Sequence, residues 1–172
     1  MRYLYLACPN RFFNVDKVAI TLKTFCSNFE KINLTKIRLT SQGIDALADC
    51  VNLREVNFIN MWTDAKNTTN VRNSFHRLFS SCQRLEKIDF SFNDALTNRE
   101  LEIITLCKNL KCLTLLRILD VTPDVCCEIF LQCPKLVEIC LDSLVVKCLI
   151  HQWNEKYQNE SYRNVTIFSS TF

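Results

Sequence analysis

The chain has 172 residues, of which 48% are hydrophobic and 23% are charged. These values are typical of one globular domain with a buried core, and they argue against a disordered tail. A formal net charge of +3 is too small to indicate a nucleic-acid partner. No stretch reaches the ~20 apolar residues of a membrane span, and the N-terminal run is too short for a secretory signal. We therefore expect a cytoplasmic or nuclear protein with no nucleic-acid or membrane partner.

One glycine and two histidines leave little material for catalytic motifs. Glycine-rich phosphate loops, dinucleotide-binding turns and nucleophile elbows all need several glycines. His76, at the expected start of a helix, and His151 are far apart, and neither has a second His, Asp or Glu at a recognisable ligand spacing. We expect solvated or packing histidines, no metal, no cofactor and no enzymatic activity.

The chain contains eleven cysteines. A small secreted protein would join them as disulfides, but Leu, Ile, Val and Phe are abundant enough here to build a core, so we expect reduced thiols. Cys126 and Cys127 are adjacent and cannot form a CxxC redox pair. Cys127 and Phe130 are three residues apart and so share the buried face of the predicted helix. We therefore expect Cys126 to be half exposed.

A repeated pattern organises the sequence when five cysteines are taken as position zero of successive units. These cysteines are separated by 24, 32, 25 and 26 residues, and positions +3, +6 and +8 after each are large and apolar. The units read Cys26, Phe29, Ile32, Leu34; Cys50, Leu53, Val56, Phe58; Cys82, Leu85, Ile88, Phe90; Cys107, Leu110, Leu113, Leu115; and Cys133, Leu136, Ile139, Leu141. Alternation at +6 and +8 predicts a short strand with one buried face in each unit. We expect the cysteines to form a ladder packed inside the turns, in preference to a metal array.

In chain order, the first predicted strand carries Leu4 and Leu6 at +6 and +8, with Met1 at +3. Apolar residues three or four apart then predict the helices Val15 to Phe25, Ser41 to Asp49, Phe75 to Ser81, Thr97 to Leu106 and Thr122 to Leu131. Thr97 and Glu100 form a capping box, and Thr122 precedes a proline at the first helical position. A helix around Leu144 to Tyr157 precedes a seventh strand, with Tyr162, Val165 and Ile167 at +3, +6 and +8. The chain thus begins inside a unit, so we expect it to continue a longer array or to be covered by a partner there.

The elements CSNFEKINL, CVNLREVNF, CQRLEKIDF, CKNLKCLTL and CPKLVEICL share the form C-x-x-L-x-x-I-x-L. With this form, nearly the whole chain resembles the cysteine-containing class of leucine-rich repeats found in F-box proteins, which select substrates for cullin-type ubiquitin ligases. The resemblance implies an α/β solenoid of about seven strands over residues 1–172, with a curved parallel sheet on the concave face and helices on the convex face. The 172 residues themselves contain no F-box, which departs from the pattern of these proteins.

The resemblance implies a non-catalytic module that binds a protein partner, with substrate recognition or an adaptor role in a ubiquitin ligase as the leading hypothesis. Two alternatives stay open, because a repeat is a scaffold for many binding surfaces. One is an assembly factor of an organelle complex. The other is a regulator that binds a GTPase or a nuclease.

Positions +5, +7 and +9 of each strand point away from the predicted core, onto the face where solenoids usually bind partners. The central candidates for partner binding are Glu55, Asn57, Lys87, Asp89, Cys112, Thr114 and Glu138. Lys31, Glu55 and Lys87 alternate in sign, so ion pairing among them is the simpler alternative. Cys112 and Cys140 are on this face in adjacent units and are candidates for oxidation or metal binding. Tyr3 and Tyr5 are candidate exposed anchors.

The third unit is about seven residues longer than its neighbours, and the excess falls in a predicted loop at 59–74. Insertions in repeat proteins map to loops that often carry function. Trp62 is the candidate partner-binding residue of this loop, and the alternative is that its indole only fills the edge of a repeat.

Overall fold

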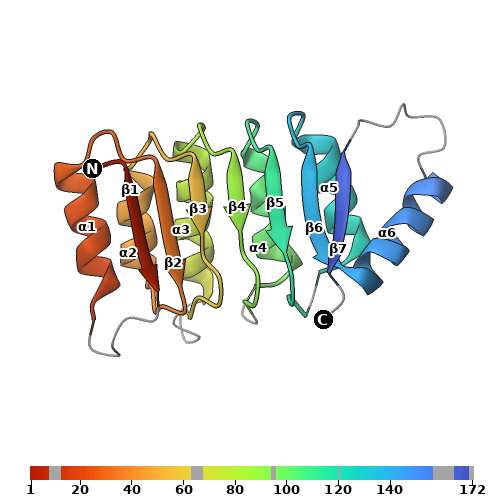
Figure 1. The fold of residues 1–172 in the computed structure, drawn as a ribbon, viewed down its shortest axis with the longest axis horizontal. Helices are drawn as coiled ribbons and strands as arrows, with labels where there is room; N and C mark the ends of the chain where they lie inside the picture. The colour runs from red at the N-terminus through yellow and green to blue at the C-terminus, as the bar shows by residue number, and fades with distance from the viewer. Residues whose placement is uncertain (8–12, 63–67, 94–95, 120, 157–164, 171–172) are drawn as a thin grey trace.

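The computed structural model describes residues 1–7, 13–62, 68–93, 96–119, 121–156 and 165–170. In these ranges seven parallel strands form one open sheet in the order β1-β2-β3-β4-β5-β6-β7, so each strand lies beside its neighbours in sequence (Figure 1). The strands are β1 (Tyr3–Ala7), β2 (Lys31–Thr35), β3 (Glu55–Asn57), β4 (Lys87–Asp89), β5 (Cys112–Leu115), β6 (Glu138–Asp142) and β7 (Thr166–Ser170). The predicted α/β class with seven strands in a parallel sheet is confirmed.

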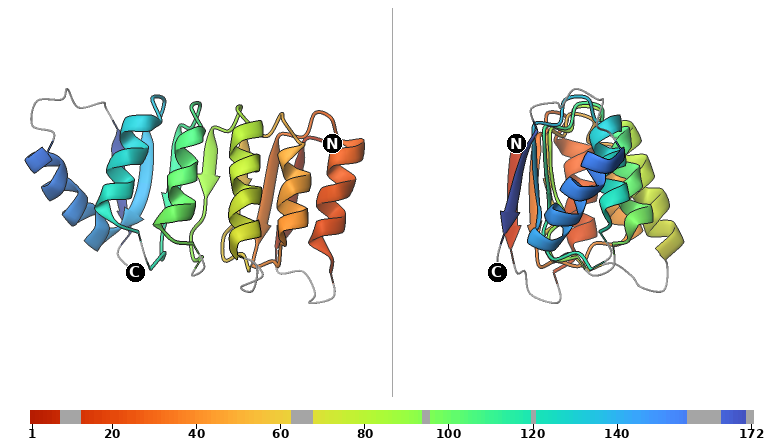
Figure 2. Two further views of the ribbon diagram at one scale, coloured as in Figure 1. Left: turned by 180° about the vertical axis from the view of Figure 1, so that it is seen from behind. Right: turned by 90° about the vertical axis from the view of Figure 1, so that its right-hand side faces the viewer.

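A helical layer covers one face of this sheet. It consists of α1 (Val15–Phe25), α2 (Ser41–Ala48), α3 (Thr68–Ser81), α4 (Asn98–Glu102), the 3-10 helix η2 (Ile103–Leu106), α5 (Pro123–Gln132) and α6 (Ser143–Lys156). The view along the sheet in Figure 2 shows all these helices on the same side of the strands. Among the described residues, therefore, no helix covers the opposite face. None of the described helices has the length and apolar character needed to cross a bilayer.

Capping residues account for the start of α1 and of α4. Asn14 Oδ1 accepts from the Lys17 amide at 2.9 Å and begins α1 at Val15, as predicted. The predicted capping box is present, with Glu100 Oε2 accepting from the Thr97 amide at 2.9 Å. Side-chain caps of this kind satisfy amides that the first helical turn leaves free.

Helix α3 differs most from the sequence-based expectation. It begins at Thr68, so the second half of the predicted loop 59–74 is helical, and His76 lies inside the helix instead of at its start. The first turn is polar except for Val71, which is buried together with Ser74 and Phe75. One apolar residue per turn is too weak a periodic signal to extend the helix by sequence alone.

Strand register places the predicted +6 residues side by side. Leu4, Ile32, Val56, Ile88, Leu113 and Ile139 are successive partners across β1 to β6. On β7 the partner of Ile139 is Ile167, where Val165 was expected, so the predicted register of the seventh unit is wrong by two residues. A shift of two keeps every side chain on the same face, so alternation cannot detect it. Tyr162, the expected +3 residue, lies outside the described residues.

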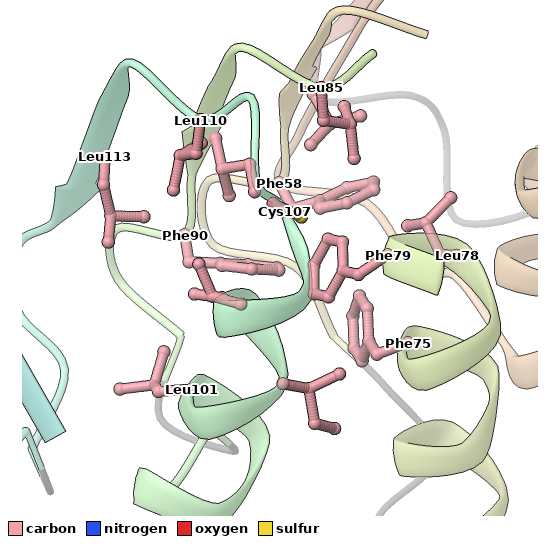
Figure 3. Packing of buried hydrophobic residues seen from close by; sticks show 14 of the residues in the cluster. Phe58, Phe75, Leu78, Phe79, Leu85, Phe90, Leu101, Cys107, Leu110 and Leu113 are labelled. Carbon is pink, nitrogen blue, oxygen red and sulfur yellow. The ribbon is translucent and has the colours of Figure 1, made fainter. Parts of the chain in front are cut away.

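The core fills the space between the sheet and the helices. Its centre is an aromatic cluster of Phe58 and Phe90, which directly follow β3 and β4, with Phe75 and Phe79 from α3 (Figure 3). The Phe58 and Phe90 rings stack with centroids 5.5 Å apart, and Phe75 meets Phe90 edge to face at 5.5 Å. Met1 was expected to be buried at +3 but is 65% exposed.

The cysteines at position zero lie in the turns that precede the strands. Cys50, Cys82, Cys107 and Cys133 are buried, and Cys26 is partly buried. The Cys82 thiol donates to the Cys50 carbonyl at 3.5 Å. Burial raises the pKa of Cys50 to about 11 and that of Cys82 to about 12. These thiols stay protonated at neutral pH and act as small apolar groups.

Ten cysteines lie in the described part of the chain and all are free; Cys8 lies outside it. Cys126 was expected to be half exposed, but it is buried, and burial raises its pKa to about 12. Val125 and Cys127 beside it are also buried. The first turns of α5 are therefore covered over a wider arc than a single apolar stripe predicts.

After each of the strands β2 to β5 the chain turns through a left-handed residue at +10: Lys36, Asn60, Phe92 and Arg117, with φ between 52° and 63°. The amide of Lys36 donates to the Ile59 carbonyl and that of Asn60 to the Ser91 carbonyl, both at 2.9 Å. The turns therefore continue the ladder of the strands. The repeated conformation shows that the units share a backbone path as well as a sequence pattern.

Candidate functional site

The face of the sheet that the described helices leave uncovered carries two rows of side chains, from positions +5 and +7. We call it the open face. The +5 row is Tyr3, Lys31, Glu55, Lys87, Cys112, Glu138, Thr166, and the +7 row is Tyr5, Asn33, Asn57, Asp89, Thr114, Cys140, Phe168. All seven predicted partner-binding residues of the sheet thus lie together on β3 to β6. Tyr3 and Tyr5 are 56% and 67% exposed at the β1 edge.

One ion pair of the +5 row forms as the charge alternation predicts. Lys31 Nζ lies 2.6 Å from Glu55 Oε1 and 5.4 Å from the centre of the Tyr3 ring. The hydrogen bond that Lys31 donates to the Glu55 carboxylate raises the pKa of Lys31. Lys87, on the other side of Glu55, is exposed and has no ion pair among the described residues. Its ammonium group is therefore available to a carboxylate from outside the chain.

Two thiols lie near the centre of the open face. The Cys112 thiol is 3.3 Å from Glu138 Oε2 and donates to it. Burial, together with this hydrogen bond, raises the pKa of Cys112, and burial beside Asp89 raises that of Cys140. Both thiols are therefore weak nucleophiles at neutral pH.

The register separates the two thiols. Cys112 lies opposite Glu138, and Cys140 lies opposite Thr114, so the cysteines are diagonal neighbours. Diagonal side chains on a sheet are roughly 7–8 Å apart, beyond the ~4 Å between the Cβ atoms of a disulfide. In the described part of the chain no three His, Cys, Asp or Glu side chains are placed to hold a metal ion. The register therefore disfavours a disulfide between these two candidate thiols.

The +7 residues have a structural role that the sequence did not reveal. Asn57 Oδ1 accepts from the Ile59 amide at 3.1 Å, and Asp89 Oδ1 accepts from the Ser91 amide at 2.9 Å. These bonds hold the chain as it enters the left-handed turn. A substitution of Asp89 would therefore perturb the fold as well as the surface. In the +5 row, Lys87 and Glu138 are exposed and make no such backbone contact among the described residues.

The prediction that +9 residues share the open face is wrong for Ser91. This side chain is buried, and its Oγ accepts from the Leu116 amide at 3.3 Å. The chain has begun to turn at this position, so the alternation of the strand no longer applies. Asn164, which was assigned to the face on β7, lies outside the described residues.

Trp62 lies beyond the C-terminal end of β3. Its backbone pairs with the segment after β2, donating to the Ile37 carbonyl at 2.8 Å and accepting from the Leu39 amide at 3.1 Å. The indole Nε1 donates to Asn60 Oδ1 at 3.1 Å, while 60% of the residue stays exposed. The indole is thus held in place without being buried, which does not agree with a role as a plug for the edge of a repeat.

A scan against models of protein families and a search of curated proteins found no match to this chain. The open face can offer a partner the exposed ammonium group of Lys87, the exposed carboxylate of Glu138 and the aromatic rings at the β1 edge. Such groups support non-covalent recognition. The two thiols do not add a nucleophile, because each has a raised pKa.

Proposed function

We propose that this chain is a leucine-rich repeat solenoid of the cysteine-containing class that binds another protein through the open face, without catalysis. The observation that carries the proposal is the one-sided cover of the sheet, which leaves two rows of mixed polar and aromatic side chains uncovered by any described helix, with exposed members on β1, β4, β6 and β7. An extended surface of adjacent strands is the usual recognition surface of solenoids. The recurrent left-handed turn at +10 supports the assignment to a repeat family.

In its most specific form, the proposal is that the chain recognises the substrate of a cullin-type ubiquitin ligase in the cytoplasm or nucleus. The support for this form is the resemblance of its units to those of F-box proteins with leucine-rich repeats. The partner is then a protein that is marked for degradation. Depletion of the chain should lengthen the half-life of that partner. An unchanged half-life would refute the role in a ubiquitin ligase but would not refute binding of the partner.

A charge exchange at the centre of the face tests the binding surface. Lys87→Glu combined with Glu138→Lys preserves net charge but reverses both signs that a partner meets. The matched control is Arg99→Glu with Glu102→Lys, an exchange of two exposed residues on α4 in the helical layer. Reversed charges should weaken partner capture at least about tenfold, because like charges across an interface are strongly unfavourable. Capture should be unchanged by the control.

Trp62 supplies a second candidate surface, because its exposed indole is held by Asn60. Tryptophan is enriched among the residues that dominate interface energies. Trp62→Ala should retain the partner if the open face binds it. If Trp62→Ala loses the partner and the charge exchange retains it, the binding surface is the turn beyond β3 and the open-face proposal is wrong. Quantitative mass spectrometry of chemically cross-linked complexes distinguishes these results.

A further inference from the structure

A second group of side chains that could take part in chemistry lies in the helical layer, away from the open face. A cavity of about 570 Å³ opens between the start of α5 and the middle of α6. Its lining includes Asp124 from α5 and Lys147, Cys148, His151 and Glu155 from α6. Figure 1 shows α6 beside α5 near the β7 end of the sheet. The cavity is widely open to solvent, so these side chains are accessible to small molecules.

Cys148 differs from the other described cysteines in its exposure. It is exposed, whereas the remaining nine cysteines in the described part of the chain are buried or partly buried. The pKa values of Cys50, Cys82 and Cys126 are raised to about 11 or 12 by burial. Since the thiolate is the reactive form, these thiols react slowly even with a reagent that reaches them.

The neighbours of Cys148 provide a base beside the thiol. His151 is three residues further along the helix, so the two side chains project from the same face with Cβ atoms roughly 5–6 Å apart. Its Nδ1 lies 3.6 Å from Glu155 Oε2, an ion-pair distance once the ring has taken up a proton. Gln152 is hydrogen-bonded to the Asp124 carboxylate, which ties this part of α6 to α5. The cavity thus brings a nucleophile, a base and a carboxylate together.

We propose that Cys148 is a modification site that undergoes thiol–disulfide exchange with low-molecular-weight disulfides, with His151 as the base. The imidazole takes the proton from Cys148 Sγ, and the thiolate attacks one sulfur of the incoming disulfide. A new S–S bond forms at Cys148 while the S–S bond of the reagent breaks. The released thiolate takes up a proton and leaves as a thiol. Cys148 is oxidised to a mixed disulfide and the departing half is reduced, so no further oxidant is needed.

Glutathione disulfide is the probe for the test, applied to the full chain at neutral pH. Peptide mapping follows the rate of glutathionylation at each cysteine. The internal reference is Cys26, a partly buried thiol that has Phe29 in place of a histidine three residues later. Cys148 should be modified at least about tenfold faster than Cys26, and Cys148→Ser should abolish this fast labelling.

His151→Gln tests the role of the base, with His76→Gln on α3 as the matched control. Both residues are exposed, so circular dichroism should show an unchanged fold. His151→Gln should slow modification of Cys148 about tenfold at neutral pH, while Lys147, Asp124 and Glu155, the other charged residues that line the cavity, are unchanged in this variant. The control should match the wild type. Equal rates for His151→Gln and the wild type, or a Cys148 that is modified no faster than Cys26, would overturn the proposal.

Discussion

Gly43 is the single glycine of the chain and lies in the first turn of α2, where alanine would ordinarily be the better residue. A Cβ added there would come closer than 3.0 Å to Asp16 Oδ1 and to Leu39 Cδ1. Asp16 cannot withdraw without cost, because its carboxylate accepts from the Thr40 amide at 3.0 Å and from Thr40 Oγ1 at 2.8 Å. Gly43 therefore leaves room for a carboxylate of α1 that holds the start of α2.

The opposing contributions to Gly43→Ala differ enough to predict its sign. Helix propensity favours alanine by about 1 kcal/mol. Overpacking costs about 1–3 kcal/mol, and each hydrogen bond to a charged group that is lost costs about 1.5–3 kcal/mol. With one such hydrogen bond lost, we expect a net loss of about 1.5–5 kcal/mol, and for a chain of this length each 1 kcal/mol lowers the melting temperature by about 2–4 °C.

Urea unfolding of Gly43→Ala, Asp16→Ala and the double variant measures this coupling. Removing the Asp16 carboxylate gives space to the new methyl group, so Gly43→Ala should cost at least about 0.5 kcal/mol less in the Asp16→Ala background. Leu39 remains in contact, but the end of its side chain can move. A stabilised Gly43→Ala, or an equal cost in both backgrounds, would refute the reasoning.

Three further outcomes follow from single residues. Ile88→Ala should lower the free energy of unfolding by roughly 2–5 kcal/mol, because Ile88 is buried between two neighbouring strands; an unchanged urea midpoint would contradict the register. Lys36→Gly should be more stable than Lys36→Ala by about 1 kcal/mol in the same assay, since φ at this position is 55° and only glycine adopts it without strain. For Cys82, the pKa is raised from 9.0 to about 12 in the folded state, so its contribution to stability is intact below about pH 9 and is lost as the pH rises toward 12. By pH 10 the raised pKa of this thiol should lower the free energy of unfolding by about 1.4 kcal/mol. The free energy of unfolding, measured in urea, should therefore decline less between pH 8 and about pH 10 for Cys82→Ala than for the wild type.

The predicted organisation and the structure agree where one short pattern serves both the strand and the core. Residues at +6 and +8 must be apolar to face the helices, and this constraint appears in every unit from Ile32 to Leu141. The helix α1 and the capping box at Thr97 were also predictable, since their signals are local. Local chemistry and period-two alternation therefore determine the succession of strands and helices.

The predictions failed where the decisive contact lies in another unit. The polar first turn of α3 is helical because Val71, Ser74 and Phe75 are buried against the sheet layer. The register of β7 differs by two residues from the expected one, and the alternation of apolar residues cannot predict a shift of two. Roles on the open face were equally hidden. The candidate residues were placed together as expected, but the backbone bonds of Asn57 and Asp89 depend on the turn that follows each strand.

The amino-acid sequence by itself determined the units, their strands and the face to which each strand residue belongs. The reason is that burial of one face of a strand requires an apolar residue at every second position. Tertiary structure decided how those units meet. It selected Lys31 as the ion-pair partner of Glu55, separated Cys112 from Cys140 diagonally, and brought Cys148 and His151 into a cavity beside Asp124. Such pairings depend on distances between residues more than twenty positions apart, and only packing of one unit against the next specifies those distances.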